Sequence, residues 1–347
     1  MSVRDYSLEE VHRQISALPE DLSALAAPAA KAAAKAARRL GAPRRLVLLG
    51  SGDSLFAAIA ALPAFAAAGI RGRAMSGGAF LTRVPSPVTC GGPATVVGIS
   101  ASGGNPTVLE AMAEAGRLGH PTVAVTCAAD GRLARAADTA VVLAPGSSAP
   151  SPGIRTYQAM LLSLLHLAQA WGWTEAGAPA ALDPGPLARA QRLSILGARA
   201  TADAVAQLLA PVPLVQLVSG VSALGTARYL AAKFSETAGV PAMAADDEDW
   251  WHVHRFGHDV RHPVLFFLTP GPGRARALEF ARRTAARSPL IVVAAEGDEE
   301  ARAVGALTVP TAARIVGTVR PLVDAAVAAP LALALARHLG RLPFCRQ

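Results

Sequence analysis

An internal repeat constrains this chain of 347 residues more than any other feature of its sequence. Three pairs of positions, each at the end or start of a short apolar run, are separated by 170, 169 and 168 residues. Offsets that agree within two residues predict the duplication of a whole domain, because the period is far longer than that of a stacked solenoid. The pairs are Gly50 and Gly220, Ser100 and Thr269, and Pro121 and Pro289.

The pattern inside each copy predicts the fold class. The expected strands are continuous apolar runs, and the segments between them, such as 107–118, have helical periodicity. Together these patterns indicate a parallel sheet covered by helices on both faces. We therefore expect two tandem, doubly wound α/β domains. The expected parts are an N-terminal helical segment at 1–43, a first domain at 44–171, a linker at 172–186 and a second domain at 187–347.

Several helix boundaries can be predicted as well. Ser7 is placed to cap a first helix, with Glu10 three residues further on. A second helix is expected over about 28–40. The segment 156–171 is apolar on most sides, which indicates a buried helix.

Composition argues against several kinds of partner. The formal net charge is +8, but the arginines are scattered, only three of the 33 cationic residues are lysines, and no nucleic-acid-binding module is recognisable. We therefore expect no nucleic-acid partner. No uninterrupted apolar stretch of about twenty residues is found, so we expect no membrane span and a cytoplasmic protein. The three cysteines, Cys90, Cys127 and Cys345, have no metal-site spacing, and Cys127 is expected to act as a small apolar residue.

Two loops of the first copy carry residues suited to an anion. Gly50-Ser51-Gly52-Asp53-Ser54 and Ser100-Ala101-Ser102-Gly103-Gly104-Asn105 each follow an expected strand and precede a helix. Hydroxyls, an amide and glycine N–H groups at a helix N-terminus suit phosphate. Either loop alone is also ordinary turn chemistry, whereas both together favour a phosphate site. Neither matches a dinucleotide fingerprint or a Walker A loop.

The second copy offers candidate catalytic groups. Lys233 and Glu236 lie three residues apart on one helix face; the alternative interpretation is a surface ion pair of little consequence. An acidic segment, Asp246-Asp247-Glu248-Asp249, leads into Trp250-Trp251-His252. His252, His254 and His258 with a carboxylate leave a metal site open as an alternative, although their spacing matches no known ligand pattern.

The order of these motifs resembles the SIS (sugar isomerase) double-domain proteins. The relevant features are the Gly-Ser loop, Ser-x-Ser-Gly, Lys-x-x-Glu and, sixteen residues after the glutamate, His252. Within that family the chain resembles the isomerase domain of glucosamine-6-phosphate synthase, fructosamine deglycases and amino-sugar phosphate deaminases. The resemblance covers essentially the whole chain and implies SIS-like domains of the flavodoxin type. The ending Leu342–Gln347 differs from the Asn-Leu-Ala-Lys-like ending of the family.

The resemblance also implies roles for individual residues. Glu236 would move a proton between C1 and C2, His252 would assist ring opening in the neighbouring subunit's site, and Lys233 would complete the catalytic set. The substrate-binding residues would come from the two loops and from the start of the buried helix. They are Ser51, Ser54, Ser100, Ser102, Gly103, Asn105 and Arg155.

The implied activity is aldose–ketose isomerisation, or isomerisation coupled to loss of an amine, on a phosphorylated sugar or amino-sugar derivative. The resemblance implies no cofactor, no metal and a homodimer. Two alternatives remain open. One is a specialised biosynthetic enzyme that uses the same proton transfer on a non-standard substrate. The other is a non-catalytic sugar-phosphate sensor.

Overall fold

The computed structural model describes residues 6–82, 92–173 and 182–344. It divides into two compact units, each described here by itself. Residues 20–146 and 155–185 form the N-terminal unit, and residues 1–19, 147–154 and 186–347 form the C-terminal unit. Cys90, Cys345 and part of the expected linker at 172–186 lie outside the described residues. The expected domain boundaries therefore stay predictions.

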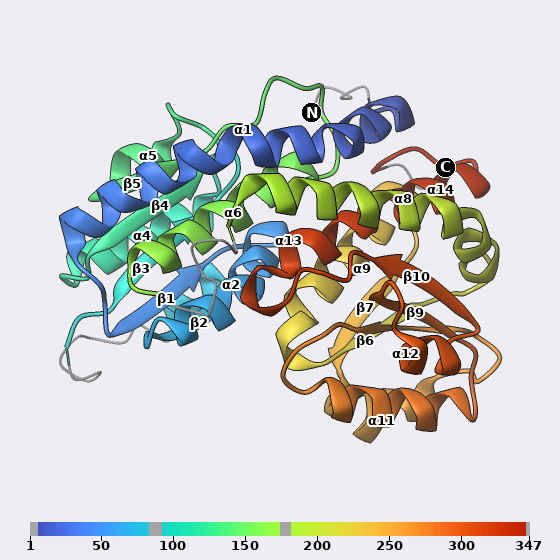
Figure 1. Cartoon of the computed structure of the whole chain (residues 1–347). Coiled ribbons are helices and arrows are strands. Elements are labelled where there is room, and N and C mark those ends of the chain that lie inside the picture. The colour runs from blue at the N-terminus through green and yellow to red at the C-terminus, as the bar shows by residue number, and fades with distance from the viewer. Residues whose placement is uncertain (1–5, 83–91, 174–181, 345–347) are drawn as a thin grey trace. The chain divides into compact units, whose positions relative to one another are not determined.

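The N-terminal unit contains one five-stranded parallel sheet in the order β2-β1-β3-β4-β5 (Figure 1). The strands are β1 (Arg45–Leu49), β2 (Arg71–Met75), β3 (Thr95–Ile99), β4 (Thr122–Thr126) and β5 (Thr139–Val142). The helices are the C-terminal part of α1 (Leu8–Leu40), α2 (Asp53–Ala67), α3 (Gly77–Thr82), α4 (Pro106–Arg117), α5 (Arg132–Ala136) and α6 (Arg155–Ala170).

Helices cover both faces of this sheet. Val47, Leu49 and Val96 pack with α3, α4 and α5 on one face. Helix α2 lies on the other face, where a Cβ atom on Gly72 of β2 would lie 3.1 Å from Leu62 Cδ2, and it packs against α6. Residues 157–168 of α6 are all buried, as its apolar composition predicts.

The C-terminal unit repeats this plan in the sheet β10-β9-β8-β6-β7, which is also parallel throughout. Its strands are β6 (Val215–Ser219), β7 (Ala242–Asp246), β8 (Val264–Leu268), β9 (Leu290–Ala295) and β10 (Leu307–Thr311). Its helices are α8 (Pro184–Leu209), η1 (Val221–Ala223), α9 (Leu224–Ala238), α10 (Asp247–His252), η2 (His254–Gly257), α11 (Arg274–Ala285), α12 (Glu299–Val304), η3 (Gly317–Val319), α13 (Pro321–Asp324), η4 (Ala325–Val327) and α14 (Ala328–His338).

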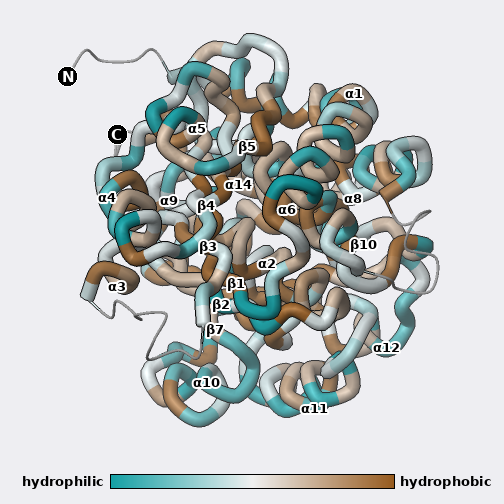
Figure 2. The backbone as a smooth tube through the Cα atoms, turned by 90° about the vertical axis from the view of Figure 1, so that its left-hand side faces the viewer, coloured by the Kyte–Doolittle hydropathy of each residue, from teal (hydrophilic) through white to brown (hydrophobic). Residues whose placement is uncertain are grey.

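The same layers recur in the second sheet. Helices α10, α11 and α12 pack on one face against Val218, Phe266 and Val292, and α9 packs with α14 and the strands β6 and β7. Figure 2 shows the hydrophobic and hydrophilic residues that alternate along α10 and α11, as expected for helices with one buried face.

The duplication predicted from the sequence extends to whole elements. Strand β6 follows β1 by 170 residues, β8 follows β3 by 169, and the starts of β9 and β10 follow those of β4 and β5 by 168. Numbered within each copy, both sheets have the order 2-1-3-4-5, which is the flavodoxin-type order. The expected fold class, two tandem doubly wound α/β domains, is confirmed.

The N-terminal helical segment differs from the expectation. One continuous helix, α1, runs from Leu8 to Leu40 through both Pro19 and Pro28. Ser7 Oγ accepts a hydrogen bond from Glu10 N (3.1 Å), so the expected cap is present. Buried residues recur at helical spacing on both sides of Pro28, from Leu22 to Ala36, so burial of this face offsets the lost hydrogen bonds.

One helical stretch, Gly317–His338, is long and apolar enough to cross a membrane by length and composition. Nearly all of its most apolar window is buried inside the protein, and it contains the buried ion pair between Arg320 and Asp324 (2.9 Å). These are features of a core helix, so the stretch is weak support for a membrane span.

Candidate functional site

The two predicted anion loops lie side by side in the N-terminal unit. Strand β1 pairs with β3, and the chain leaves their carboxyl ends toward α2 on one face and α4 on the other. The connections after β1 and β3 diverge at this place, and ligands of open α/β sheets bind in the crevice that results. The topology therefore brings 50–54 and 100–105 to the switch point of this sheet.

Close backbone packing shapes the first loop. A Cβ atom on Gly50 would lie 2.7 Å from the backbone N of Leu55, so the loop needs glycine at this position. Gly52 has φ +54° and begins α2 without a side-chain cap. Ser51 is exposed beside it. The loop thus has an exposed hydroxyl at the N-terminus of α2.

Two predicted binding residues have partners inside the unit. Ser54 is buried, and its hydroxyl donates to Met160 Sδ on α6 (3.4 Å). Arg155 forms a two-point ion pair with Asp21 of α1 at 2.5 Å and donates to Gly146 O (2.7 Å). Both residues thus have structural contacts, and their roles toward a ligand stay predictions.

The second loop combines a capped helix start with an exposed hydroxyl. Asn105 caps α4 by accepting from Val108 N (3.1 Å). Ser102 is exposed and accepts a long bond from Gly104 N (3.3 Å), so its hydroxyl proton can be donated to a ligand. Gly103 has φ +62°, and a Cβ atom there would lie 3.1 Å from Gly131 Cα. Ser100 is buried at the base of the loop.

The structure adds Arg132, a residue that the sequence analysis missed. It is exposed at the first position of α5 and donates to Gly104 O (3.2 Å). Leu133 N donates to Gly103 O (3.0 Å), which holds the start of α5 against the serine loop. The signal in the sequence was the position of Arg132 just after the next strand, β4, at the same edge of the sheet.

In the C-terminal unit, Lys233 and Glu236 form an ion pair in the last turns of α9. The Lys233 side chain is 0% exposed and that of Glu236 31%. Lys233 Nζ also lies 3.5 Å from Gly153 O and 4.9 Å from the ring centre of Tyr229. The Tyr229 hydroxyl donates to Gly153 O (3.1 Å).

The burial of Lys233 argues against the interpretation as a surface ion pair. Taking an ammonium group out of water is costly unless it is paired, so an organised set of partners is needed here. Gly153 and Tyr229 belong to this set and were not found from the sequence. The partly exposed carboxylate of Glu236 remains accessible to a ligand.

Glu236 and His252 flank opposite ends of β7. Glu236 precedes the amino end of β7, and His252 is an exposed residue after its carboxyl end. The five residues of β7 span about 16 Å at 3.3 Å per residue. The role of His252 in a neighbouring subunit's site stays a prediction.

The segment of acids and tryptophans is explained by packing. Asp246 caps α10 by accepting from Glu248 N (3.0 Å) and Asp249 N (2.9 Å). Trp250 is buried and donates to Gln216 Oε1 (2.8 Å). The ring of Trp251 contacts Phe280 and the guanidinium groups of Arg255 and Arg283. Asp247 is fully buried, and burial raises its pKa although Arg276 lies 3.7 Å away.

The metal alternative gains no support. Across 6–82, 92–173 and 182–344, no three His, Cys, Asp or Glu side chains gather as a metal site. His258 Nε2 instead lies 3.2 Å from His262 O, and burial lowers its pKa. Burial raises the pKa of Cys127 to about 12, so this thiol stays protonated at neutral pH, in line with a small apolar role.

Comparison with solved structures gives the class of fold. The chain is similar to the C-terminal domain of glucosamine-fructose-6-phosphate aminotransferase from Francisella tularensis (TM-score 0.85, 14% identity, 96% of this chain and 97% of that one). It is also similar to tagatose-6-phosphate ketose/aldose isomerase from Escherichia coli (TM-score 0.76, 17% identity, 96% of each chain). A third similar structure is that of glucosamine-6-phosphate deaminase from Thermotoga maritima (TM-score 0.73, 15% identity, 96% of each chain).

These likenesses extend over almost the full length of both partners and confirm the SIS-type double-domain fold that the motifs implied. At these identities they show the fold alone. No family model matches the sequence, and no curated protein matches it.

Proposed function

We propose that this chain is a cofactor-free, metal-free enzyme that moves a proton between C1 and C2 of a phosphorylated sugar or amino sugar. The product would be the isomeric ketose or aldose, or, from an amino sugar, a keto sugar and an amine. We expect it to act as a cytoplasmic homodimer in which His252 serves the neighbouring subunit's site.

The observation that carries the proposal is the partly exposed Glu236 carboxylate held by the fully buried Lys233. A carboxylate is the usual base for removing a proton next to a carbonyl, and a fixed position raises its efficiency. The exposed Ser102 hydroxyl and the loop around it, in a fold shared with proteins named as phosphosugar enzymes, support a phosphorylated substrate.

In the proposed reaction, His252 assists opening of the sugar ring, and Glu236 then removes the proton from C2 of the aldose. The electrons of the C2–H bond form the C1=C2 bond of an enediol while the carbonyl oxygen gains a proton. Glu236 returns its proton at C1, and the C2 hydroxyl loses its proton as the ketone forms. With nitrogen on C2, water hydrolyses the resulting imine and releases the amine.

The test is isotope exchange. Incubation with a panel of hexose and amino-sugar phosphates in deuterated water should place deuterium at C1 or C2 of one of them, read by NMR. Glu236→Gln keeps an oxygen that can accept from Lys233 and should slow exchange by about 10²–10⁴-fold, the usual contribution of a general base.

The matched control is Glu279→Gln. It removes the same charge from an exposed residue of α11 in the same unit, whose partner is Arg283 (2.7 Å). This variant should exchange at the wild-type rate. A Glu236→Gln protein that is folded by circular dichroism and retains near-normal exchange would show that Glu236 is not the base.

The internal contacts of Ser54 and Arg155 favour a second candidate, an enzyme with the same proton transfer but a non-standard substrate. If neither side chain contacts the substrate, the part of the substrate near Ser54 and Arg155 would differ from a sugar phosphate. No exchange with any hexose phosphate, together with exchange in a compound of another class, would select this candidate. Thermal stabilisation by a sugar phosphate without exchange would indicate a sensor.

A further inference from the structure

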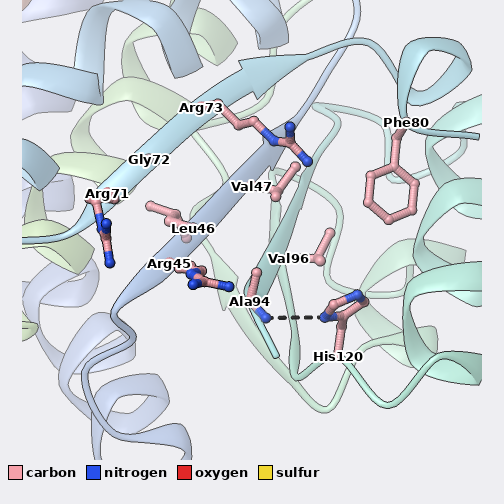
Figure 3. A pocket seen from close by; sticks show the side chains of 10 residues that line it. All are labelled: Arg45, Leu46, Val47, Arg71, Gly72, Arg73, Phe80, Ala94, Val96 and His120. Atoms are coloured by element: carbon pink, nitrogen blue, oxygen red, sulfur yellow. Dashed lines mark hydrogen bonds between the residues drawn. The ribbon is translucent and has the colours of Figure 1, made fainter. Parts of the chain in front are cut away.

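A cavity of about 380 Å³ lies in the N-terminal unit at the amino ends of β1, β2 and β3 (Figure 3). The strands of this sheet are parallel, so the cavity and the Ser51 and Ser102 loops lie at opposite edges of it. The proposed reaction makes no use of this cavity. Phe80 and Val96, both fully buried, form part of its apolar wall.

Three arginines line the cavity. Arg45 begins β1, and Arg71 and Arg73 lie on the neighbouring strand β2, where Arg71 is the residue opposite Arg45. Figure 3 shows the guanidinium groups of Arg45 and Arg73 turned toward the side on which Phe80 and His120 lie. Like charges directly opposite each other on paired strands are destabilising, so this arrangement calls for an anion.

No protein group in the described ranges neutralises these charges. None of the three arginines forms an ion pair or a side-chain hydrogen bond with a described residue. Arg45 Nη1 is buried from solvent and has no acceptor among those residues. A buried donor is normally paired, so an unpaired one in a residue that lines a cavity indicates a missing oxygen acceptor.

Protection of the sheet edge against pairing with other chains explains only two of the three arginines. Strand β2 is an edge strand, and exposed charges on such strands prevent pairing with other chains. This accounts for Arg71 and Arg73, which are both exposed. It does not account for Arg45, because β1 is an interior strand and the Nη1 atom of Arg45 is buried.

His120 adds a polar group to the same wall. The residue is buried, and its Nδ1 accepts a hydrogen bond from Ala94 N (3.1 Å), as the dashed line in Figure 3 shows. A neutral imidazole whose Nδ1 accepts must carry its proton on Nε2, so the ring is a donor at that atom. The polar groups of the cavity are thus predominantly donors.

The second copy of the domain lacks this set. Val215, Ala242 and Ala244 hold the places of Arg45, Arg71 and Arg73 in β6 and β7, and Ser288 holds that of His120 before β9. The shared strand geometry therefore does not require basic residues here. The charges are specific to the N-terminal unit.

We propose that this cavity is a binding site for a small anion with at least two negative charges, separate from the site of the proposed reaction. The guanidinium groups of Arg45, Arg71 and Arg73 bind its charged oxygens, and Phe80 and Val96 contact its apolar part. Guanidinium groups bind phosphates and carboxylates in the same two-point geometry, so a phosphate ester and a polycarboxylate share the required chemistry.

The test is calorimetric titration with pyrophosphate and with citrate in a chloride buffer free of other oxyanions. Wild-type protein should bind at least one of them, and Arg45→Gln and Arg73→Gln should each weaken that binding by about tenfold or more. Tighter binding of pyrophosphate would identify a phosphate ester as the natural ligand class, and tighter binding of citrate a polycarboxylate.

Two controls separate this site from others. Arg287→Gln removes the same charge from an exposed residue of the C-terminal unit and should bind as wild type. Ser102→Ala changes the predicted substrate loop, and the component of binding that Arg45→Gln and Arg73→Gln weaken should be the same in this variant as in the wild type. Because Arg73 is exposed, its variant tests the proposal even if Arg45→Gln fails to fold.

Binding that is unchanged in both Arg45→Gln and Arg73→Gln, or lost only in Ser102→Ala, would overturn the proposal. So would the absence of binding by either anion at millimolar concentration. None of these results depends on isotope exchange, so failure of the proposed reaction and failure of this site are distinguishable.

Discussion

After β3 the N-terminal unit continues with Ser100–Asn105, whereas after β8 the C-terminal unit continues with Thr269–Gly273. The first loop has an exposed hydroxyl and a capped helix start. In the second, Pro270 and Pro272 lack N–H donors, and α11 begins without a side-chain cap.

The charged residues beside the two loops also make the first loop better suited to an anion than the second. Arg132 lies beside the serine loop, where it adds a positive charge. At the equivalent edge of the C-terminal unit, Arg274 is bound to Asp298 (2.5 and 2.7 Å) and to Glu300 (3.0 Å). One edge is therefore suited to an anion, and the cation at the other is already neutralised. The shared topology thus positions the loops, while their residues decide the chemistry.

The largest effect is expected from the first βα turn. Gly50→Ala places a Cβ atom 2.7 Å from the backbone N of Leu55 and should destabilise the protein by about 3 kcal/mol, the upper end for overpacking. Gly220→Ala, at the equivalent position, meets nothing within 4 Å and should leave stability nearly unchanged. Urea denaturation of both variants measures the difference, and equal losses would contradict the idea that the two turns have diverged.

A smaller effect is expected in ligand binding. Ser102→Ala should weaken the binding of a phosphorylated ligand by about 1–3 kcal/mol, the value of a hydrogen bond to a charged group. Thr269→Ala, the counterpart after β8, should have no effect. Titration with the substrate found by isotope exchange compares them. In crystals grown in sulfate, an anion should bind at the loop after Ile99 and none at the loop after Leu268. Anions at both loops would contradict the difference proposed between the two units.

The smallest effect concerns Asp247, the first residue of α10; the corresponding helix of the N-terminal unit, α3, begins with Gly77. Burial raises the pKa of Asp247 in the folded state, so the unfolded chain releases this proton at lower pH. Above pH about 4, the ionised carboxylate therefore costs stability, and the cost disappears as the pH falls below that value.

Asp247→Asn should therefore raise Tm at pH 7, by about 2–4 °C for each kcal/mol recovered, and have little effect at pH 3.5. Asp249→Asn removes the same charge from an exposed neighbour and serves as the control. A lower Tm for Asp247→Asn at pH 7 would mean that attraction to Arg276 outweighs the burial of the charge.

The sequence by itself determined the architecture of both units. Short apolar strands are patterns within a few residues, and the offset of 168–170 residues between copies is read directly along the chain. The structure reproduces both, as strands and as sheet order. The sequence also predicted that the Gly50 and Ser100 loops lie close together, since parallel strands bring such loops to one edge of the sheet. The division of the N-terminal helix at Pro28 was wrong, because the cost of a proline is local while the burial that offsets it extends along the helix.

The environment of the side chains, in contrast, depends on contacts between distant parts of the chain. Lys233 is buried by a contact with Gly153, 80 residues earlier, and Arg155 is paired with Asp21, 134 residues away. Arg45, Arg71 and Arg73 form one charged cavity only through the pairing of β1 with β2. Burial and charge pairing depend on residues far apart in the chain, and no local pattern encodes which of them meet.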